Sequence, residues 1–357
     1  NAKDFQNLMD VYLDAVFYPL IYENPYTLRQ EGWHYNIEEP TDALSYNGVV
    51  YNEMKGAFSA PEQILYRKIT DTLFPDTIYS VESGGDPDVI PQLTYAQFLD
   101  FHRKYYHPSN SYIYLYGNMD VAEKLAFIDE AYLCQFDNTR VDSAIAKQAP
   151  FAHTSVTRGE YPIGNDDRED NAAYMAYSWV VGDSLDAKLC LGFQILEYAL
   201  MEAPGAPLKQ ALLDKGFGED IYGMFETSLI QPYLSIIIKN INEEDRDEIV
   251  QVIQTELKKL ADGGLNHKTL EGALNYYEFK SREGDFGRWP KGLMYGLQLM
   301  DSWLYDDNKP FVHLKFQAVY DELREGLSKG YFEDLIRHYM IDNTHCSVYL
   351  LCPSKGL

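Results

Sequence analysis

A polar stretch near the middle of the chain constrains its architecture more than any other feature. Charge and polarity rise from Asp137 to Gln148, and Pro150 closes the stretch. Apolar patterns typical of strands and helices occur on both sides of it, so the stretch is typical of a linker between domains. A chain of 357 residues also suits two cores of about 150 to 200 residues each. The sequence therefore predicts one domain over residues 1–150 and a second over residues 151–357.

Both halves of the chain combine strand patterns with amphipathic helices. In the first half, residues 112–116 predict a strand and residues 120–133 a helix. In the second half, we expect a helix over residues 186–202, three or four more between 244 and 339, and strands at 172–181, 221–227, 232–239 and 346–351. The similar order of elements predicts an α+β fold of two similar domains, each a sheet covered by helices.

The charge of the chain excludes some partners and leaves one class open. Fifty-five acidic residues against thirty basic ones give a net charge of -25, which repels a phosphate backbone and argues against nucleic-acid binding. A cationic peptide would be attracted, although acidity also serves simply to keep a protein in solution. No apolar run approaches the ~20 residues of a membrane-spanning helix. The four cysteines lack Cys-x-x-Cys spacing, which indicates reduced structural thiols rather than disulfides or a cysteine zinc site.

The stretch from Ser45 to Phe58 contains the side chain most suggestive of a functional site. Its pattern is that of a helix, and Glu53 lies among the positions expected to be buried, which are Val49, Val50, Met54 and Ala57. A buried carboxylate needs a positive partner, because an unpaired buried charge costs several kcal/mol or is neutralised by a shifted pKa. Two interpretations follow. Glu53 pairs with Lys55 or with an arginine elsewhere, or it is a metal ligand held on a rigid helix.

Several motifs of this chain, taken in order, resemble those of one family of peptidases. The run Gly-Val-Val-Tyr-Asn-Glu-Met-Lys-Gly, residues 48–56, resembles the third-ligand helix of the presequence protease branch of the insulinase (pitrilysin-like) zinc metallopeptidases. The resemblance covers nearly the whole chain through further motifs at residues 4–8, 12–15, 30–33, 80–87, 106–110, 207–212, 290–293 and 302–305. It implies the duplicated α+β domain of the insulinase and mitochondrial-processing-peptidase fold.

The zinc site that the resemblance implies is incomplete in this sequence. The family is an inverzincin, in which His-x-x-Glu-His supplies two zinc ligands and the general base, and a downstream glutamate completes the site. None of the eight histidines begins this motif or its inverse. In the family the motif lies upstream of the helix that corresponds to the one carrying Glu53. The resemblance therefore implies Glu53 as one of three zinc ligands, in a fragment that lacks the upstream motif and the C-terminal half of the family.

The function implied by the resemblance is that of a zinc metalloendopeptidase, which encloses and degrades unfolded peptides, basic ones included. The chain as given is expected to be inactive, because one carboxylate cannot form a tetrahedral site that normally takes three protein ligands and a water. The catalytic residues are expected in the missing motif. The remainder of the parent polypeptide is the partner expected to complete the site. No substrate-binding residue is assigned.

The alternative is a non-catalytic scaffold or core-subunit relative of the same family, and the retention of Glu53 argues against it. The bacterial cytoplasm is the expected location, with the mitochondrial matrix or another organelle as the alternative. Neither a nucleic acid nor a membrane is an expected partner.

Other polar side chains are interpreted as structural. His34 and Glu38 would lie four positions apart on the solvent face of a strand. His102 and His107 are five apart, a poor spacing for two ligands on one helix face. The patch at residues 282–290 offers arginines and a tryptophan to a peptide, but salt bridges within a connection between helices explain it as well.

Overall fold

The computed structural model describes residues 2–218 and 220–357, and their contacts form two compact units. The first unit comprises the residues up to Ser59 together with Glu82–Ala144, and the second comprises Ala60–Val81 and Ile145–Leu357. The predicted boundary at residue 150 lies near the last passage between the units. The segment Ala60–Val81, in contrast, joins the second unit and not the first. The chain therefore passes from one unit to the other three times.

The first unit is mainly helical. Its helices are α1 (Ala2–Phe17), α2 (Val49–Ala57), α4 (Tyr95–Tyr105) and α5 (Val121–Ala131), with short helical turns at Leu20–Tyr22, Leu28–Gly32, Ile90–Gln92, Pro108–Asn110 and Leu133–Gln135. The core forms where α1 meets the end of α5, with Met9, Leu13, Phe17, Ile128 and Tyr132 buried together. Helix α5 confirms the helix expected over residues 120–133. The side chain of Asp120 caps it by accepting a hydrogen bond from the backbone N–H of Glu123.

The sheet of the first unit is small. Among the described residues it consists of β1 (His34–Asn36) and β2 (Ser45–Asn47), which pair antiparallel. The strand predicted over residues 112–116 is absent, because no described strand lies beside these residues and a strand needs a neighbour to satisfy its backbone groups. The apolar alternation has another cause, since Ile113 and Leu115 pack against the core of α1 and α5.

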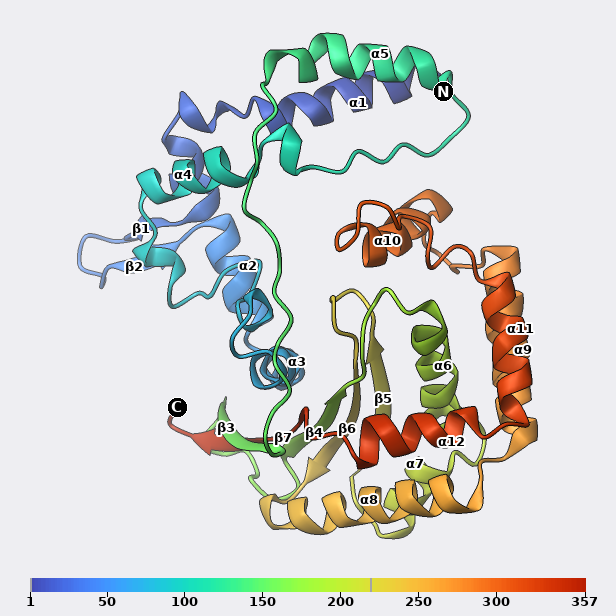
Figure 1. Cartoon of the computed structure of the whole chain (residues 1–357). Coiled ribbons are helices and arrows are strands. Elements are labelled where there is room, and N and C mark those ends of the chain that lie inside the picture. The colour runs from blue at the N-terminus through green and yellow to red at the C-terminus, as the bar shows by residue number, and fades with distance from the viewer. Residues whose placement is uncertain (1, 219) are drawn as a thin grey trace. The chain divides into compact units, whose positions relative to one another are not determined.

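The second unit is built on a five-stranded mixed sheet (Figure 1). Its strands, in the order in which they lie side by side, are β3 (Ser155–Ile163), β7 (Cys346–Lys355), β4 (Ala173–Val180), β6 (Tyr233–Ile241) and β5 (Asp220–Glu226). Strand β3 runs parallel to β7, and the other neighbours are antiparallel. Four of the strands confirm those that the sequence predicts, and β3 is one that it does not predict.

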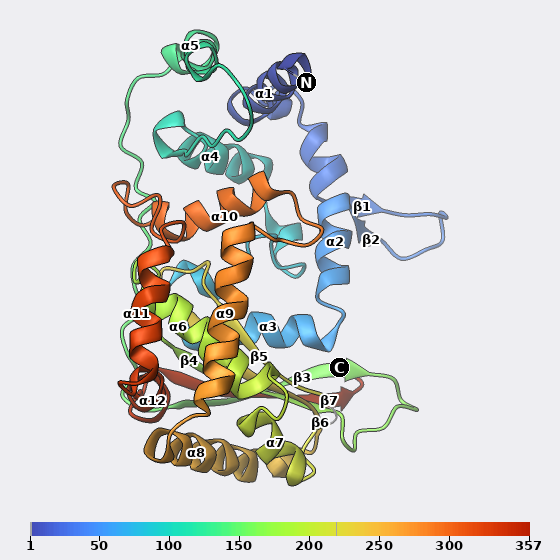
Figure 2. The ribbon, with the colours of Figure 1, turned by 90° about the vertical axis from the view of Figure 1, so that its right-hand side faces the viewer.

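Helices cover both faces of this sheet (Figure 2). On one face lies α3 (Pro61–Leu73), whose side chains Leu65, Ile69 and Leu73 are fully buried in a cluster shared with the sheet. The other face carries the larger apolar core. Strands β4 and β6 are buried almost throughout because they have helices on both sides. The predicted α+β class is confirmed.

The larger helical layer of the second unit follows the apolar periodicity of the sequence. The helix expected over residues 186–202 is present as α6 (Ala187–Glu197), which continues as a π-helical turn, η7 (Tyr198–Glu202). The other helices are α7 (Pro207–Asp214), α8 (Arg246–Gly263), α9 (His267–Glu283), α10 (Lys291–Trp303), α11 (Gln317–Leu327) and α12 (Tyr331–Ile336), with short turns at Ile78–Ser80, Glu243–Asp245 and Arg337–Ile341. In the described part of the chain, no helix is both long and apolar enough to cross a membrane.

Candidate functional site

Helix α2, which carries Glu53, begins at a backbone position that requires glycine. Gly48 has a φ of +149°, and a β-carbon there would overlap the carbonyl oxygen of Gly32. The side chain of Asn47 accepts hydrogen bonds of 2.7 Å from the backbone N–H of Gly48 and from the side-chain amide of Asn52. These contacts fix the first turn of α2, so Glu53 projects from a rigid support.

The surroundings of Glu53 differ from those that the sequence predicts. Met54 is buried, but Val49 and Val50 are 56% and 37% exposed, and Glu53 itself is exposed. The apolar stripe predicted around Glu53 is therefore wrong for this chain, because Met54 is the buried side chain of α2. The pairing with Lys55 or an arginine is not realised either, since Glu53 has no ion-pair or hydrogen-bond partner among residues 2–218 and 220–357. Its carboxylate is open to a ligand.

A metal would find one donor here. No group of three or more His, Cys, Asp or Glu side chains able to hold a metal ion occurs among the described residues. The exposed, partnerless carboxylate of Glu53 fits one ligand of a tetrahedral zinc site, whereas the remaining donors are not found near it. Among the described residues, Glu53 is therefore a candidate for one ligand of such a site.

Two of the histidines that were interpreted as structural, His102 and His34, make hydrogen bonds within the first unit. His102 is hydrogen bonded at Nδ1 to the hydroxyl of Tyr22, at 2.6 Å, and at Nε2 to the carbonyl oxygen of Val16, at 3.0 Å. His34 contacts the carbonyl oxygen of Arg29 through Nδ1, at 2.6 Å. Both ring nitrogens of His102 are engaged, so this side chain holds α4 to the N-terminal segment and is not free to bind a metal.

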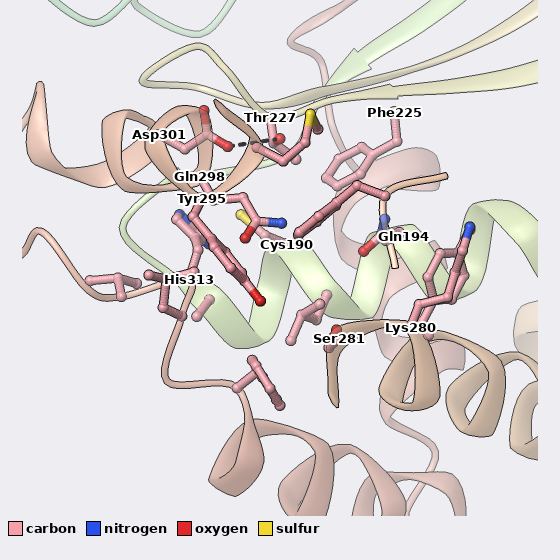
Figure 3. A pocket seen from close by; sticks show the side chains of 18 of the residues that line it. Cys190, Gln194, Phe225, Thr227, Lys280, Ser281, Tyr295, Gln298, Asp301 and His313 are labelled. Carbon is pink, nitrogen blue, oxygen red and sulfur yellow. Dashed lines mark hydrogen bonds between the residues drawn. The ribbon is translucent and has the colours of Figure 1, made fainter. Parts of the chain in front are cut away.

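A cavity of about 420 Å³ lies within the second unit (Figure 3). Its walls come from α6, the end of β5, α9, α10 and the turn that precedes α11. Its lining includes the carboxylates of Glu197 and Asp301, the imidazole of His313 and the thiol of Cys190. The sequence analysis identified none of these residues. The available signal was a single carboxylate, Glu197, within the apolar run of residues 195–201.

Burial sets the protonation of these groups. It raises the pKa of Glu197 from 4.5 to about 7, and the carboxylate of Glu202 adds to the rise. Burial also raises the pKa of Asp301 from 3.8 to about 7, with Glu226 adding to it and the hydrogen bond from Thr227 opposing it. Burial lowers the pKa of His313, which keeps the imidazole neutral near pH 7.

Arg282, in the patch at residues 282–290, is part of a salt-bridge network. Arg282 donates two hydrogen bonds to Oε1 of Glu278, at 2.9 and 2.6 Å, and Arg324 of α11 donates to Oε2 of the same carboxylate. These bonds lower the pKa of Glu278 against the effect of its burial. The interpretation of Arg282 as a structural residue therefore agrees with its contacts, which join α9 to α11.

The second unit, a mixed sheet between layers of helices, and the mainly helical first unit together make an α+β protein. The sequence matches the family described as "Peptidase M16 inactive domain" over residues 92–277, just over half of the chain. The chain therefore belongs to the M16 peptidase family.

Solved structures show the same fold at low sequence identity. A putative M16-like peptidase from Alicyclobacillus acidocaldarius aligns with a TM-score of 0.61 at 16% identity, covering 86% of this chain and 69% of that one. A peptidase M16 inactive domain from Pseudomonas fluorescens also aligns with a TM-score of 0.61, at 14% identity, covering 85% of this chain and 69% of that one. The predicted fold class is confirmed by these similarities.

Curated relatives identify the branch of the family. Protein HypA of Clostridium perfringens is 48% identical over 100% of this chain and 37% of its own length. Presequence protease 1 of Arabidopsis thaliana, chloroplastic/mitochondrial, is 38% identical over 97% of this chain and 32% of its own length. The mitochondrial presequence protease of Danio rerio is 31% identical over 99% of this chain and 35% of its own length. The resemblance to the presequence protease branch is confirmed, and the chain spans about a third of the length of these relatives.

Proposed function

We propose that this chain is part of a zinc metalloendopeptidase that degrades unfolded peptides, and that Glu53 is its third zinc ligand. The observation that carries the proposal is the exposed carboxylate of Glu53, which has no partner among the described residues and projects from a helix whose first turn is held by Asn47. It stands in a chain of the M16 family whose relatives include proteins named presequence protease. A carboxylate without a positive partner on the protein is available for a cation.

Within this proposal the chain supplies and positions one negatively charged zinc ligand, the carboxylate of Glu53. The backbone turn at Gly48 and the hydrogen bonds of Asn47 orient α2, and Glu53 offers its carboxylate one turn later. The two other protein ligands and the general base come from a His-x-x-Glu-His motif in the parent polypeptide. When bound, zinc lowers the pKa of a water and polarises the peptide carbonyl.

The two predicted domains receive different roles in the proposal. Residues 1–150 belong to the zinc-bearing domain and residues 151–357 form a second, non-catalytic domain. The family description "inactive domain" over residues 92–277 supports a non-catalytic role for much of the chain. The isolated chain is accordingly expected to hydrolyse no peptide.

Substrate and location are part of the proposal. Relatives are named presequence protease, and a net charge of -25 favours the approach of cationic unfolded peptides. A relative at 48% identity comes from a bacterium, which supports the bacterial cytoplasm as the location. A mitochondrial or chloroplast compartment is the alternative, since other relatives carry those words in their names.

The test is Glu53→Gln in the full-length parent enzyme. The substitution keeps size and hydrogen bonding but removes the negative charge, so zinc content and cleavage of a basic unstructured peptide should both fall at least ~10- to 100-fold. Glu38→Gln is the matched control, because Glu38 is also exposed in the first unit, and it should leave both quantities unchanged. Normal zinc content and turnover in Glu53→Gln would remove Glu53 from the ligand set.

A second candidate function is that of a non-catalytic scaffold of the same family. The family description "inactive domain" favours it. The sequence encoded upstream of Asn1 in the parent gene distinguishes the two candidates. An intact His-x-x-Glu-His motif there supports the peptidase, and a degenerate one supports the scaffold.

A further inference from the structure

The cavity of the second unit contains a buried carboxylate that nothing in the described structure neutralises. Glu197 is only 9% exposed, lines the cavity, and has neither a hydrogen-bond nor an ion-pair partner among residues 2–218 and 220–357. Burying a carboxylate without a partner is unfavourable by several kcal/mol when it is ionised. A side chain kept in such a place is a candidate for ligand binding, because a bound cation would supply the missing partner.

The fold makes room for this carboxylate specifically. Gly223 of β5 faces α6, and a β-carbon at that position would clash with the carboxylate of Glu197. Glu197 is also the last residue of α6 before the π-helical turn η7, and such turns change the direction of side chains and occur frequently at functional sites.

A second carboxylate lies toward the other end of the cavity. Asp301 of α10 receives one long hydrogen bond, 3.5 Å, from the hydroxyl of Thr227, and the described residues offer it no ion pair. Burial raises the pKa of the Cys190 thiol, and the nearby carboxylates of Asp186 and Asp301 add to the rise, which places Asp301 near Cys190. Glu197 lies seven positions after Cys190, about 10 Å further along the axis of α6. The two carboxylates therefore act from different ends of the cavity.

The positive groups at the cavity do not balance these charges. Figure 3 shows Asp301 and His313 on one side of the cavity and Lys280 on the other. The ammonium of Lys280 lies 4.9 Å from the centre of the Tyr276 ring, and no ion pair joins it to a carboxylate within the described chain. Asp285 adds a third carboxylate to the lining. The lining thus holds three carboxylates and one amino group.

The remaining lining suits the stem of a long side chain. Phe225, Met294 and Tyr295 provide apolar and aromatic walls, and Gln194 and Gln298 provide amide groups (Figure 3). Arginine and lysine bury their methylene stems against such walls while their cationic heads reach a polar partner. A volume of about 420 Å³ accommodates one side chain of this size.

We propose that this cavity binds an arginine or lysine side chain of an unfolded peptide, with the carboxylate of Glu197 as the anion that contacts the cation. Asp301 contributes negative potential from the other end of the cavity, and the aromatic wall packs on the stem. The inference rests on the proposed function only in taking a peptide as the bearer of the cation. The binding site itself belongs to residues of the second unit and needs no zinc.

The test measures binding, not cleavage, with this chain as it is. The probes are the blocked tripeptide acetyl-Ala-Arg-Ala-amide and its neutral counterpart with citrulline in place of arginine, titrated by calorimetry at pH 8. The arginine peptide should bind at least tenfold more tightly than the citrulline peptide. Equal affinities, or no binding of either peptide up to millimolar concentration, would overturn the proposal.

Variants locate the binding to the cavity. Glu197→Gln should weaken binding of the arginine peptide at least tenfold. The control is Glu202→Gln, which makes the same charge change at an exposed position outside the cavity lining. It should leave the affinity unchanged or raise it slightly, because Glu202 opposes the ionisation of Glu197. Unchanged affinity in a folded Glu197→Gln protein, or a similar loss in both variants, would refute the assignment.

A pH titration gives an independent readout. Glu202 on η7 and Tyr277 on α9 interact electrostatically with Glu197, and Lys280 and Asp285 line the same cavity. On β5, Gly223 lies against the carboxylate of Glu197, and Glu226 acts on Asp301. Binding should strengthen from pH 6 to pH 8 as Glu197 and Asp301 ionise. Binding with the same affinity at both pH values would contradict the role of Glu197. If the parent enzyme showed no zinc-dependent cleavage, the proposed function would fail. The binding results expected here would not change, because they need no zinc.

Discussion

The unpaired carboxylate of Glu197 should make the second unit less stable at alkaline pH than at acidic pH. Its pKa is about 7 in the folded chain against an ordinary value of 4.5. The folded state therefore prefers the protonated acid. The stability associated with that acid is fully present below pH 4.5, declines between pH 4.5 and 7, and is lost above pH 7.

The magnitude follows from the shift. Since one pKa unit corresponds to about 1.4 kcal/mol, a rise from 4.5 to about 7 makes the ionised carboxylate unfavourable by about 3 kcal/mol. Glu197→Gln removes the charge but leaves a buried amide without a partner, which costs about 1 to 2 kcal/mol. We expect the variant to be about 1 to 2 kcal/mol more stable than the parent chain at pH 8. At pH 5 it should be no more stable than the parent chain.

Urea denaturation at pH 5, 6, 7 and 8, followed by tryptophan fluorescence, measures this difference. Trp179, Trp289 and Trp303 lie in the second unit and only Trp33 in the first, so the signal reports mainly on the unit that contains Glu197. The control is Glu271→Gln on the exposed surface of α9, which should change the unfolding free energy by less than about 0.5 kcal/mol at every pH. A stability difference between Glu197→Gln and the parent that stays constant from pH 5 to pH 8 would refute the reasoning.

Three further predictions concern other contacts. Gly223→Ala should lower the unfolding free energy by about 1 to 3 kcal/mol, because the added β-carbon clashes with the carboxylate of Glu197. In the Glu197→Ala background the same change should lower the unfolding free energy much less. An equal loss of stability in both backgrounds would contradict the clash. Glu278→Gln should destabilise the second unit by about 1 to 3 kcal/mol at pH 7, because two arginines lose their shared carboxylate. This loss of stability should shrink as the pH falls through the lowered pKa of Glu278. Denaturation of both proteins at pH 7 and pH 3 measures the difference. Glu53→Gln in this chain should leave the melting temperature unchanged, because Glu53 is exposed and has no partner among the described residues. The unaltered chain is expected to be inactive, and chelator-sensitive hydrolysis of a basic peptide by this chain would contradict that expectation.

The strands of the second unit show what an apolar pattern can and cannot predict. Strands β4 and β6 are flanked by helices on both faces, so their apolar runs are visible in the sequence. Strand β3 is an edge strand that contains Gly159, Pro162 and alternating polar residues, and edge strands need no apolar run. The false strand at residues 112–116 has the opposite cause, because its apolar side chains pack on helices and not within a sheet.

The candidate sites show the same limit for charged residues. The sequence places Glu53 on a helix, as the structure does, but the surrounding valines are exposed, so the expected burial is wrong. Glu197 meets the condition that was argued for Glu53, a carboxylate within an apolar helix and without a partner. The helical pattern alone does not distinguish the two, because burial depends on which elements pack against a helix. For Glu197 the decisive neighbour is Gly223, which lies 26 positions away along the chain.

The passage of Ala60–Val81 into the second unit has a consequence for biosynthesis. Helix α3 leaves the ribosome before any strand of the sheet that covers Leu65, Ile69 and Leu73, and the last of those strands, β7, begins only at Cys346. At a synthesis rate of about 5 to 20 residues per second, the apolar face of α3 waits roughly 15 to 55 s for the complete sheet. During that interval α3 presents a ready target for chaperones on the nascent chain. A ribosome stalled between the codons for α3 and β7 should therefore recruit more chaperone than one stalled before α3.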